Sequence, residues 1–152
     1  MFASANGRHR FRTRPPQLAT WSGKGTGTVV SVGPDGSETA IWSRELLNIP
    51  VSAFITDDAK YVVTFDTWAK LGYEHAIVVY GERGAVVVDY DLEMLLSSEE
   101  IDRHVRQTIG ARRWLQGATI AFDTGDTHIV INLSWGKIIR MALATGRIET
   151  AR

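Results

Sequence analysis

A group of arginine and aromatic residues in the second half of the chain is best suited by residue type to bind a ligand. Arg112, Arg113 and Trp114 are consecutive, and two further arginines precede them. A guanidinium group binds phosphate, a tryptophan ring stacks on a base or a sugar, and both residue types anchor protein interfaces. The alternative is a solvated helix face followed by a core tryptophan. Because loops on a rigid sheet often carry function, we predict a binding site from this cluster and the loop that contains Trp68 and Tyr73.

Aspartates form a second group, concentrated around two predicted turns. The set consists of Asp57, Asp58, Asp66, Asp123 and Asp126. Carboxylates brought close in space can bind calcium, or divide into the acid and base of a hydrolase. However, aspartate is common in turns because it bonds its own backbone, and the spacing of an EF-hand is missing. We expect structural turns and no metal site, and a carboxylate hydrolase is the alternative.

Other catalytic patterns are missing from the sequence. Without cysteine there is no disulfide, thiolate nucleophile or cysteine-ligated metal. The four histidines form no HxH or HExxH pattern, and no serine lies in a GxSxG elbow. The glycines of residues 23–27 precede a predicted strand, whereas a dinucleotide site needs a helix there. We therefore favour a non-enzymatic domain without a cofactor.

The charge of the chain is balanced but unevenly distributed. Seventeen basic and seventeen acidic residues give a formal net charge of zero, which argues against a domain dominated by nucleic-acid binding and favours self-association. The first 20 residues nevertheless contain no acid and four arginines, namely Arg8, Arg10, Arg12 and Arg14. We predict a disordered basic leader over residues 1–20. The alternative is an arm that contacts nucleic acid or an anionic surface.

The sequence contains no apolar run near the roughly 20 residues that span a bilayer. The first 20 residues also have no apolar segment of the kind found in signal peptides. We expect a cytoplasmic protein by default, or an exported one if a precursor was processed.

Short β-branched runs separated by turn residues predict one mostly β domain over residues 21–152. It divides into units at about 26–43, 51–91 and 113–150. The first is a hairpin around Gly33-Pro34-Asp35-Gly36. The predicted strands of the other two units are 51–56, 61–66, 75–80, 85–90, 113–115, 118–123, 128–133, 137–142 and 147–150. The runs IVVY and AVVV within the second unit indicate strands covered on both faces.

One short helix is predicted between the second and third units. Ser97 and Glu100 have the spacing of a capping box, and Ile101 and Val105 lie on one helical face. We expect this helix at about 98–107.

The second and third units are related as an internal repeat. Residues 56–68 align with residues 123–135 without a gap at an offset of 67, which matches Trp68 with Trp135. Gly84 then matches Gly146 at an offset of 62. The acidic turn Thr56-Asp57-Asp58-Ala59 and the strand Tyr61-Val62-Val63-Thr64 that follows resemble a β-propeller blade of the YVTN or WD40-like kind. They are also similar to a group of uncharacterised bacterial propeller-like proteins.

This resemblance implies an antiparallel meander of two blade-like units plus an N-terminal hairpin. A propeller needs about four or more blades, each of about 40 to 45 residues, so 152 residues hold two and a fraction. The chain is then a fragment of a propeller, an oligomer that completes one, or an open sheet or sandwich. Exposed strand edges favour pairing with another chain, so we expect an interaction domain with a protein partner or with itself.

Overall fold

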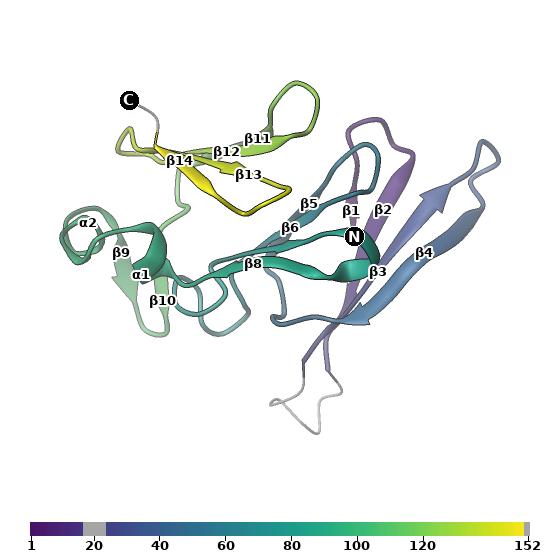
Figure 1. The fold of residues 1–152 in the computed structure, drawn as a ribbon. Coiled ribbons are helices and arrows are strands. Elements are labelled where there is room, and N and C mark those ends of the chain that lie inside the picture. The colour runs from purple at the N-terminus through teal and green to yellow at the C-terminus, as the bar shows by residue number, and fades with distance from the viewer. Residues whose placement is uncertain (17–23, 151–152) are drawn as a thin grey trace.

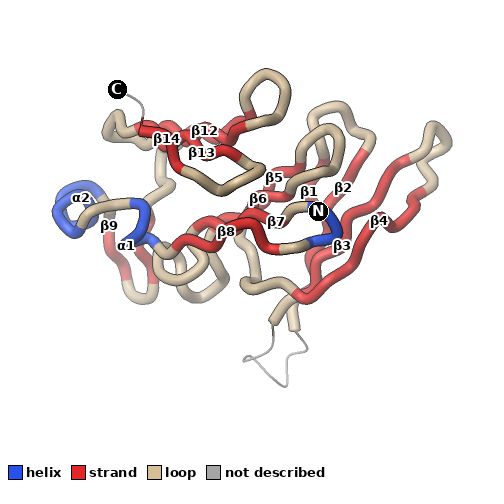
Figure 2. Tube along the Cα trace, viewed as in Figure 1, coloured by secondary structure: helices blue, strands red, loops and turns tan. Residues whose placement is uncertain are grey.

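Four-stranded antiparallel sheets dominate the computed structural model, which describes residues 1–16 and 24–150 (Figures 1 and 2). In each of the three sheets the strands lie in chain order. The first contains β1 (Phe2–Ala3), β2 (His9–Arg14), β3 (Thr26–Val32) and β4 (Glu38–Glu45). The second contains β5 (Ser52–Ile55), β6 (Val62–Phe65), β7 (Ile77–Tyr80) and β8 (Val86–Tyr90). The third contains β11 (Thr119–Phe122), β12 (His128–Asn132), β13 (Ile138–Ala142) and β14 (Ile148–Thr150).

Short elements connect these sheets. The 3-10 turn η1 (Glu82–Gly84) joins β7 to β8. Between the second and third sheets lie α1 (Leu92–Leu95), α2 (Ser98–His104) and a hairpin of β9 (Arg106–Thr108) and β10 (Ala111–Arg113). Figure 1 shows these elements at the end of the molecule away from the first sheet. No helix of the described residues has the length and apolarity to cross a membrane.

The arginine-rich start of the chain is a strand, which corrects the prediction of a disordered leader for residues 1–16. β2 pairs with β3 from His9↔Ser31 to Arg14↔Thr26. Phe11 is fully buried, whereas Arg10 and Arg12 lie on the opposite face and share Glu38. The alternation of side chains along a strand therefore explains a sequence that resembles a charge run. Residues 17–20 of the predicted leader lie outside the described residues.

The predicted repeat is confirmed by the strand registers. Ser52 pairs with Phe65 in the second sheet, and Thr119 pairs with Asn132 in the third, which preserves the offset of 67. The offset of 62 also holds: Val86 pairs with Tyr80 of β7, and Ile148 pairs with Met141, the equivalent residue of β13.

The first sheet is a third copy of the same unit, which the sequence prediction missed. In its β1–β2 turn, the Ser4 amide donates to the His9 carbonyl at 2.9 Å. The Thr56 amide donates to the Tyr61 carbonyl, and the Asp123 amide to the His128 carbonyl, in the equivalent turns. In each turn the first side chain also accepts the amide hydrogen of the last residue, at 3.1, 3.1 and 2.8 Å. The fourth position has positive φ in all three, as Gly7, Ala59 and Asp126. The residue types Ser-Ala-Asn-Gly do not reveal this equivalence to the other two turns, because what the three turns share is a hydrogen-bond pattern.

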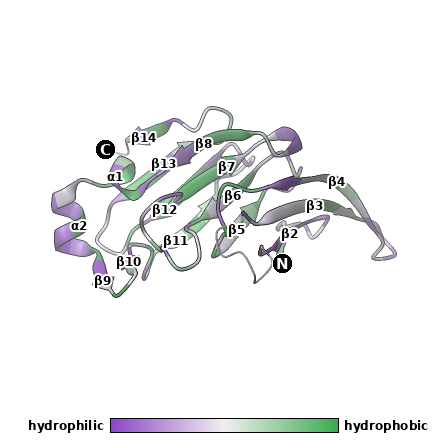
Figure 3. Ribbon diagram, turned by 90° about the horizontal axis from the view of Figure 1, so that it is seen from below, coloured by the Kyte–Doolittle hydropathy of each residue, from purple (hydrophilic) through white to green (hydrophobic). Residues whose placement is uncertain are grey.

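The second sheet lies between the other two and joins them. Val62, Val78 and Tyr80 pack toward the first sheet. Val63, Phe65, Ile77 and Val79 pack toward the third sheet. Every residue of β6 and β7 is buried as a result, and Figure 3 shows β7 as strongly hydrophobic.

The prediction of two covered faces is therefore confirmed for the run IVVY. It is wrong for AVVV, because β8 is an edge strand on which Val86 is 46% exposed.

The outward faces of the first and third sheets are mainly polar. On the first sheet, the Thr28 and Ser43 hydroxyls share a hydrogen bond of 2.9 Å, and Glu38 forms ion pairs with arginines of β2. On the third sheet, Arg140 lies 3.1 Å from Asp123 and 3.2 Å from Glu149. The apolar contacts thus lie between the three sheets.

The helix α2 begins with the predicted capping box. Ser97 accepts the Glu100 amide hydrogen, and the Glu100 carboxylate accepts that of Ser97. Glu100 also lies 2.8 Å from Lys137 and holds α2 against the third sheet. The helix ends at His104, earlier than predicted, because β9 starts two residues later; α1 is a further helix that was not predicted.

Candidate functional site

The segment between β6 and β7 is longer than its counterpart in the third sheet. The pairs Phe65↔Ile77 and Asn132↔Ile138 are equivalent, and they enclose eleven residues (66–76) against five (133–137). We call residues 66–76 the inserted loop. Its residues with positive φ are Asp66, Ala69, Gly72 and His75. Such conformations are uncommon outside glycine and persist where the surrounding structure enforces them.

Asp66 fixes the inserted loop from within. Its carboxylate is buried and accepts hydrogen bonds from the Gly72 amide at 2.9 Å and the Trp114 indole at 3.1 and 3.2 Å. Burial raises the pKa of the Asp66 carboxyl, and the bonds from Trp114 and Gly72 oppose this effect. Gly72 is required here, because a Cβ would lie 2.2 Å from the Arg112 carbonyl oxygen.

Arg112 joins the inserted loop to β10 and α1. Its Nε donates to the Gly72 carbonyl at 2.5 Å, and its Nη2 lies 2.6 Å from Glu93. The guanidinium stacks 4.1 Å from the centre of the Tyr73 ring. Desolvation at Glu93 is outweighed by the bond from Arg112, so the pKa of Glu93 is lowered. Because Arg112 is 8% exposed, it acts as a clamp between three elements.

The structure brings together part of the predicted site. Arg112 stacks on Tyr73, whereas Trp114 is only 1% exposed and bonds to Asp66 at the start of the inserted loop. Arg113 is exposed on β10. Trp68 is 61% exposed and lines a different depression, beside His75.

The tryptophans matched by the repeat differ in their surroundings. Trp135 stacks on His104 of α2 with ring centres 5.0 Å apart, whereas Trp68 lies at the surface. The difference follows from the extra length of the inserted loop.

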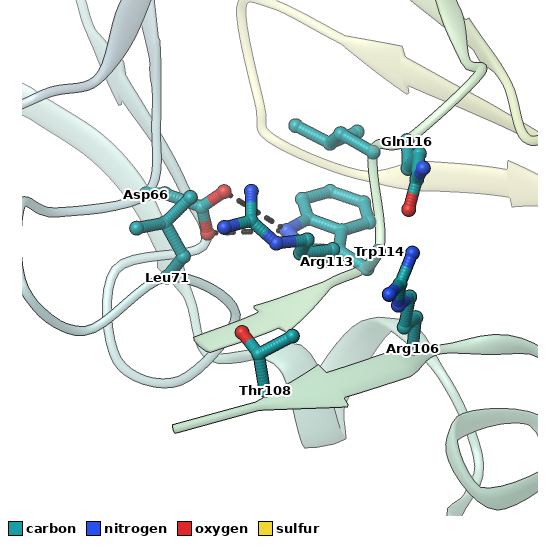
Figure 4. A pocket seen from close by; sticks show the side chains of 8 residues that line it. Asp66, Leu71, Arg106, Thr108, Arg113, Trp114 and Gln116 are labelled. Atoms are coloured by element: carbon teal, nitrogen blue, oxygen red, sulfur yellow. Dashed lines mark hydrogen bonds between the residues drawn. The ribbon is translucent and has the colours of Figure 1, made fainter. Parts of the chain in front are cut away.

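An open cavity of about 550 Å³ lies beside Asp66 and Trp114 (Figure 4). Its polar walls come from β9, β10 and the segment that follows. The lining residues are Asp66, Leu71, Arg106, Thr108, Arg113, Trp114, Leu115 and Gln116. The sequence prediction included Arg113 and Trp114 but did not assign a role to Gln116 or Thr108. Neither has a sequence signal, because the β9–β10 hairpin is what brings them together.

A second depression is bordered by the inserted loop, and large exposed apolar side chains occur at or next to its lining residues. This depression is lined in part by Ala69, Tyr73, Glu93 and Gly110. The exposed side chains belong to these residues or their immediate neighbours. They are Trp68, Tyr73, Met94 and Ile109, which we call the tip surface. Exposed apolar clusters are typical of interaction sites.

The carboxylates of the acidic turns accept hydrogen bonds from their own turn or from a neighbouring one. Asp58 accepts the Lys60 amide hydrogen at 2.9 Å, and Asp123 accepts that of Thr127 at the same distance. Asp57 accepts from Asn6, and Asp126 accepts from the Asp57 amide, each at 2.8 Å. Within residues 1–16 and 24–150, no three metal-ligating side chains are grouped to hold an ion. Asp57 and Asp126 therefore link turns of neighbouring sheets, whereas Asp58 and Asp123 stabilise their own turns.

His75 and Asp89 form a pair that the sequence did not predict. The His75 Nδ1 lies 2.9 Å from both carboxylate oxygens, so the ring is held at the end of the inserted loop. His75 lies just before β7 and Asp89 lies near the end of β8. Their spacing in the sequence does not indicate that they form a pair.

No family model matches the chain, and no curated protein matches it. Among solved structures, it is similar to HIRA(644-1017), with 19% identity, a TM-score of 0.47 and coverage of 82% of this chain and 33% of that chain. It is also similar to the periplasmic gluconolactonase PpgL of Pseudomonas aeruginosa, with 12% identity, a TM-score of 0.45 and coverage of 99% and 37%. The chain spans about a third of the length of each.

The strand order and the registers describe the architecture directly. Each sheet is a four-stranded antiparallel meander, the three sheets pack face to face, and one turn recurs in all of them. These are the features of propeller blades. The chain is therefore built of propeller-like β repeats.

Proposed function

We propose that this chain is a non-enzymatic interaction domain that binds protein through its tip surface. The observation that carries the proposal is the combination of a rigid inserted loop and exposed apolar side chains at its surface. Ile109 and Met94 are more than 60% exposed, as is Trp68. Such side chains favour a partner that covers them, because burying apolar area is favourable by about 25 cal/mol per Å².

Rigidity of the tip surface supports binding. The Arg112 clamp and the Asp66 hydrogen bonds hold the loop in one conformation. A preorganised surface loses little conformational entropy when a partner binds. Aromatic residues are frequent energetic anchors of such surfaces, and Trp68 and Tyr73 are the aromatic members of the tip surface.

A second copy of the chain is the first partner to test, since the formal net charge of zero gives little long-range repulsion. Sedimentation velocity over a wide concentration range measures the association. We expect the wild type to associate at high concentration, and Trp68→Ser and Ile109→Ser to remain monomeric.

Ile138→Ser is the matched control, because Ile138 is exposed on the third sheet and does not belong to the tip surface. It should associate as the wild type does. A wild type that stays monomeric throughout would exclude self-association, and equal association of all four proteins would place any interface elsewhere.

A further inference from the structure

Two arginines lie directly opposite each other on the β9–β10 hairpin. Arg106 pairs with Arg113 in the antiparallel register. Both side chains line the cavity beside Trp114 (Figure 4). Directly opposed residues have Cβ atoms about 4.5 to 5.5 Å apart, and like charges at this separation destabilise the pair.

Neither positive charge is neutralised within the described residues. No carboxylate oxygen there lies within 4.0 Å of the Arg106 or Arg113 side chain, and neither side chain makes a hydrogen bond there. Their neighbour Arg112 differs, because it lies 2.6 Å from Glu93. The cavity lining thus contains two guanidinium groups that form no ion pair within the described residues, and its one carboxylate belongs to Asp66.

The rest of the lining fits a small ligand with an anionic group. The Thr108 hydroxyl and the Gln116 amide are uncharged donors, and Leu71, Trp114 and Leu115 add apolar surface. The Asp66 carboxylate is already bonded to Trp114 and Gly72. A volume of about 550 Å³ is within the range of small-molecule sites, roughly 300 to 1,000 Å³.

We propose that Arg106 and Arg113 form an oxyanion site for a small molecule that bears a phosphate or carboxylate group. The two guanidinium groups bind the anion together, and charge-assisted hydrogen bonds replace their mutual repulsion. Thr108 and Gln116 donate to the same group or to its neighbours. This site lies beside the tip surface and does not depend on its proposed role.

Thermal unfolding and titration calorimetry with inorganic phosphate test this site, with sodium chloride at matched ionic strength as the reference. Phosphate should raise the unfolding midpoint of the wild type. Arg106→Gln and Arg113→Gln should each weaken phosphate binding by about tenfold or more, the effect of losing one charge-assisted hydrogen bond. In chloride alone, each variant should unfold about 1 to 3 °C higher than the wild type, because the repulsion is gone.

Arg147→Gln is the matched control, because Arg147 is exposed on the third sheet and away from the cavity. It should respond to phosphate as the wild type does. Phenyl phosphate and benzoate distinguish the two anions: stronger binding of one identifies the group that the site prefers.

Equal phosphate responses in Arg113→Gln and the wild type would overturn the proposal, as would a wild type that responds to none of the three anions. Sedimentation of Arg113→Gln separates this outcome from the proposed interaction, since it should associate as the wild type does.

Discussion

Asp66 is a buried carboxylate whose hydrogen bonds come from uncharged donors, Trp114 and Gly72. Its pKa is raised in the folded state by burial. The unfolded chain therefore releases this proton at lower pH, near 3.9, while the native state retains it. The contribution of Asp66 to the free energy of unfolding is therefore complete at pH values below its pKa in the unfolded chain. It is lost as the pH rises through its pKa in the folded protein.

Asp66→Asn removes this titration and keeps an oxygen that accepts the same hydrogen bonds. We expect the stability of the wild type, relative to the variant, to fall as pH rises above about 4. Urea unfolding at a series of pH values measures the difference. Parallel stability curves would show that Asp66 titrates alike in both states.

Arg112 is the residue on which the position of the inserted loop depends. We expect Arg112→Ala to destabilise the protein by about 2 to 3 kcal/mol, because hydrogen bonds to a charged group are lost in a buried site. Hydrogen exchange should become faster at the Gly72 amide. Arg103→Ala is the control: its exposed ion pair with Glu99 is worth about 0.5 kcal/mol or less. Unchanged exchange at Gly72 in the Arg112 variant would contradict the clamp.

The turn before β14 packs closely against β8 of the second sheet. A Cβ on Gly146 would lie 2.4 Å from the Cβ of Val88 on β8. Tyr90 also donates to the Gly146 carbonyl at 2.7 Å. Gly36 has a similar positive φ but nothing within 4 Å of a built Cβ.

The two glycines therefore separate backbone strain from steric clash. Gly146→Ala should destabilise the protein by about 1 to 3 kcal/mol more than Gly36→Ala, which is the cost of overpacking. Chemical denaturation of both variants checks this. Equal losses of stability would show that Gly146 is not packed tightly against Val88.

The sequence predicted the elements whose signal is local. The capping box at Ser97 and the β-branched runs of β6 and β12 are set by neighbouring residues. The prediction failed for β2, where three arginines concealed the single fully buried residue Phe11. The positions of Arg113 and Trp114 in a cavity depend on a three-residue strand, β9, too short to recognise from its sequence. Asp66 was grouped with acidic turns because its partner Trp114 is 48 residues away.

At the scale of the whole molecule, the two faces of β7 connect the outer sheets. Val78 packs toward the first sheet and its neighbour Val79 toward the third, and both are fully buried. Val78→Ala and Val79→Ala remove the same atoms from opposite interfaces. We expect each to cost about 2 to 3 kcal/mol and to shift one common unfolding transition.

Fluorescence and circular dichroism, followed during the same denaturation, should give coincident curves for both variants. Two separate transitions in either variant would show that one outer sheet unfolds independently of the central one.

The equivalent strand pairs that enclose residues 66–76 and 133–137 have a consequence for protein engineering. Because the framework on either side has the same register, the segment between these strands can differ in length, and five residues are enough to join them. Diversity can therefore be introduced at the exposed residues of the longer segment, provided that Asp66 and Gly72, which bond to Trp114 and Arg112, are kept. The third sheet offers a second position of this kind at residues 133–137, so one molecule can display two different inserted segments.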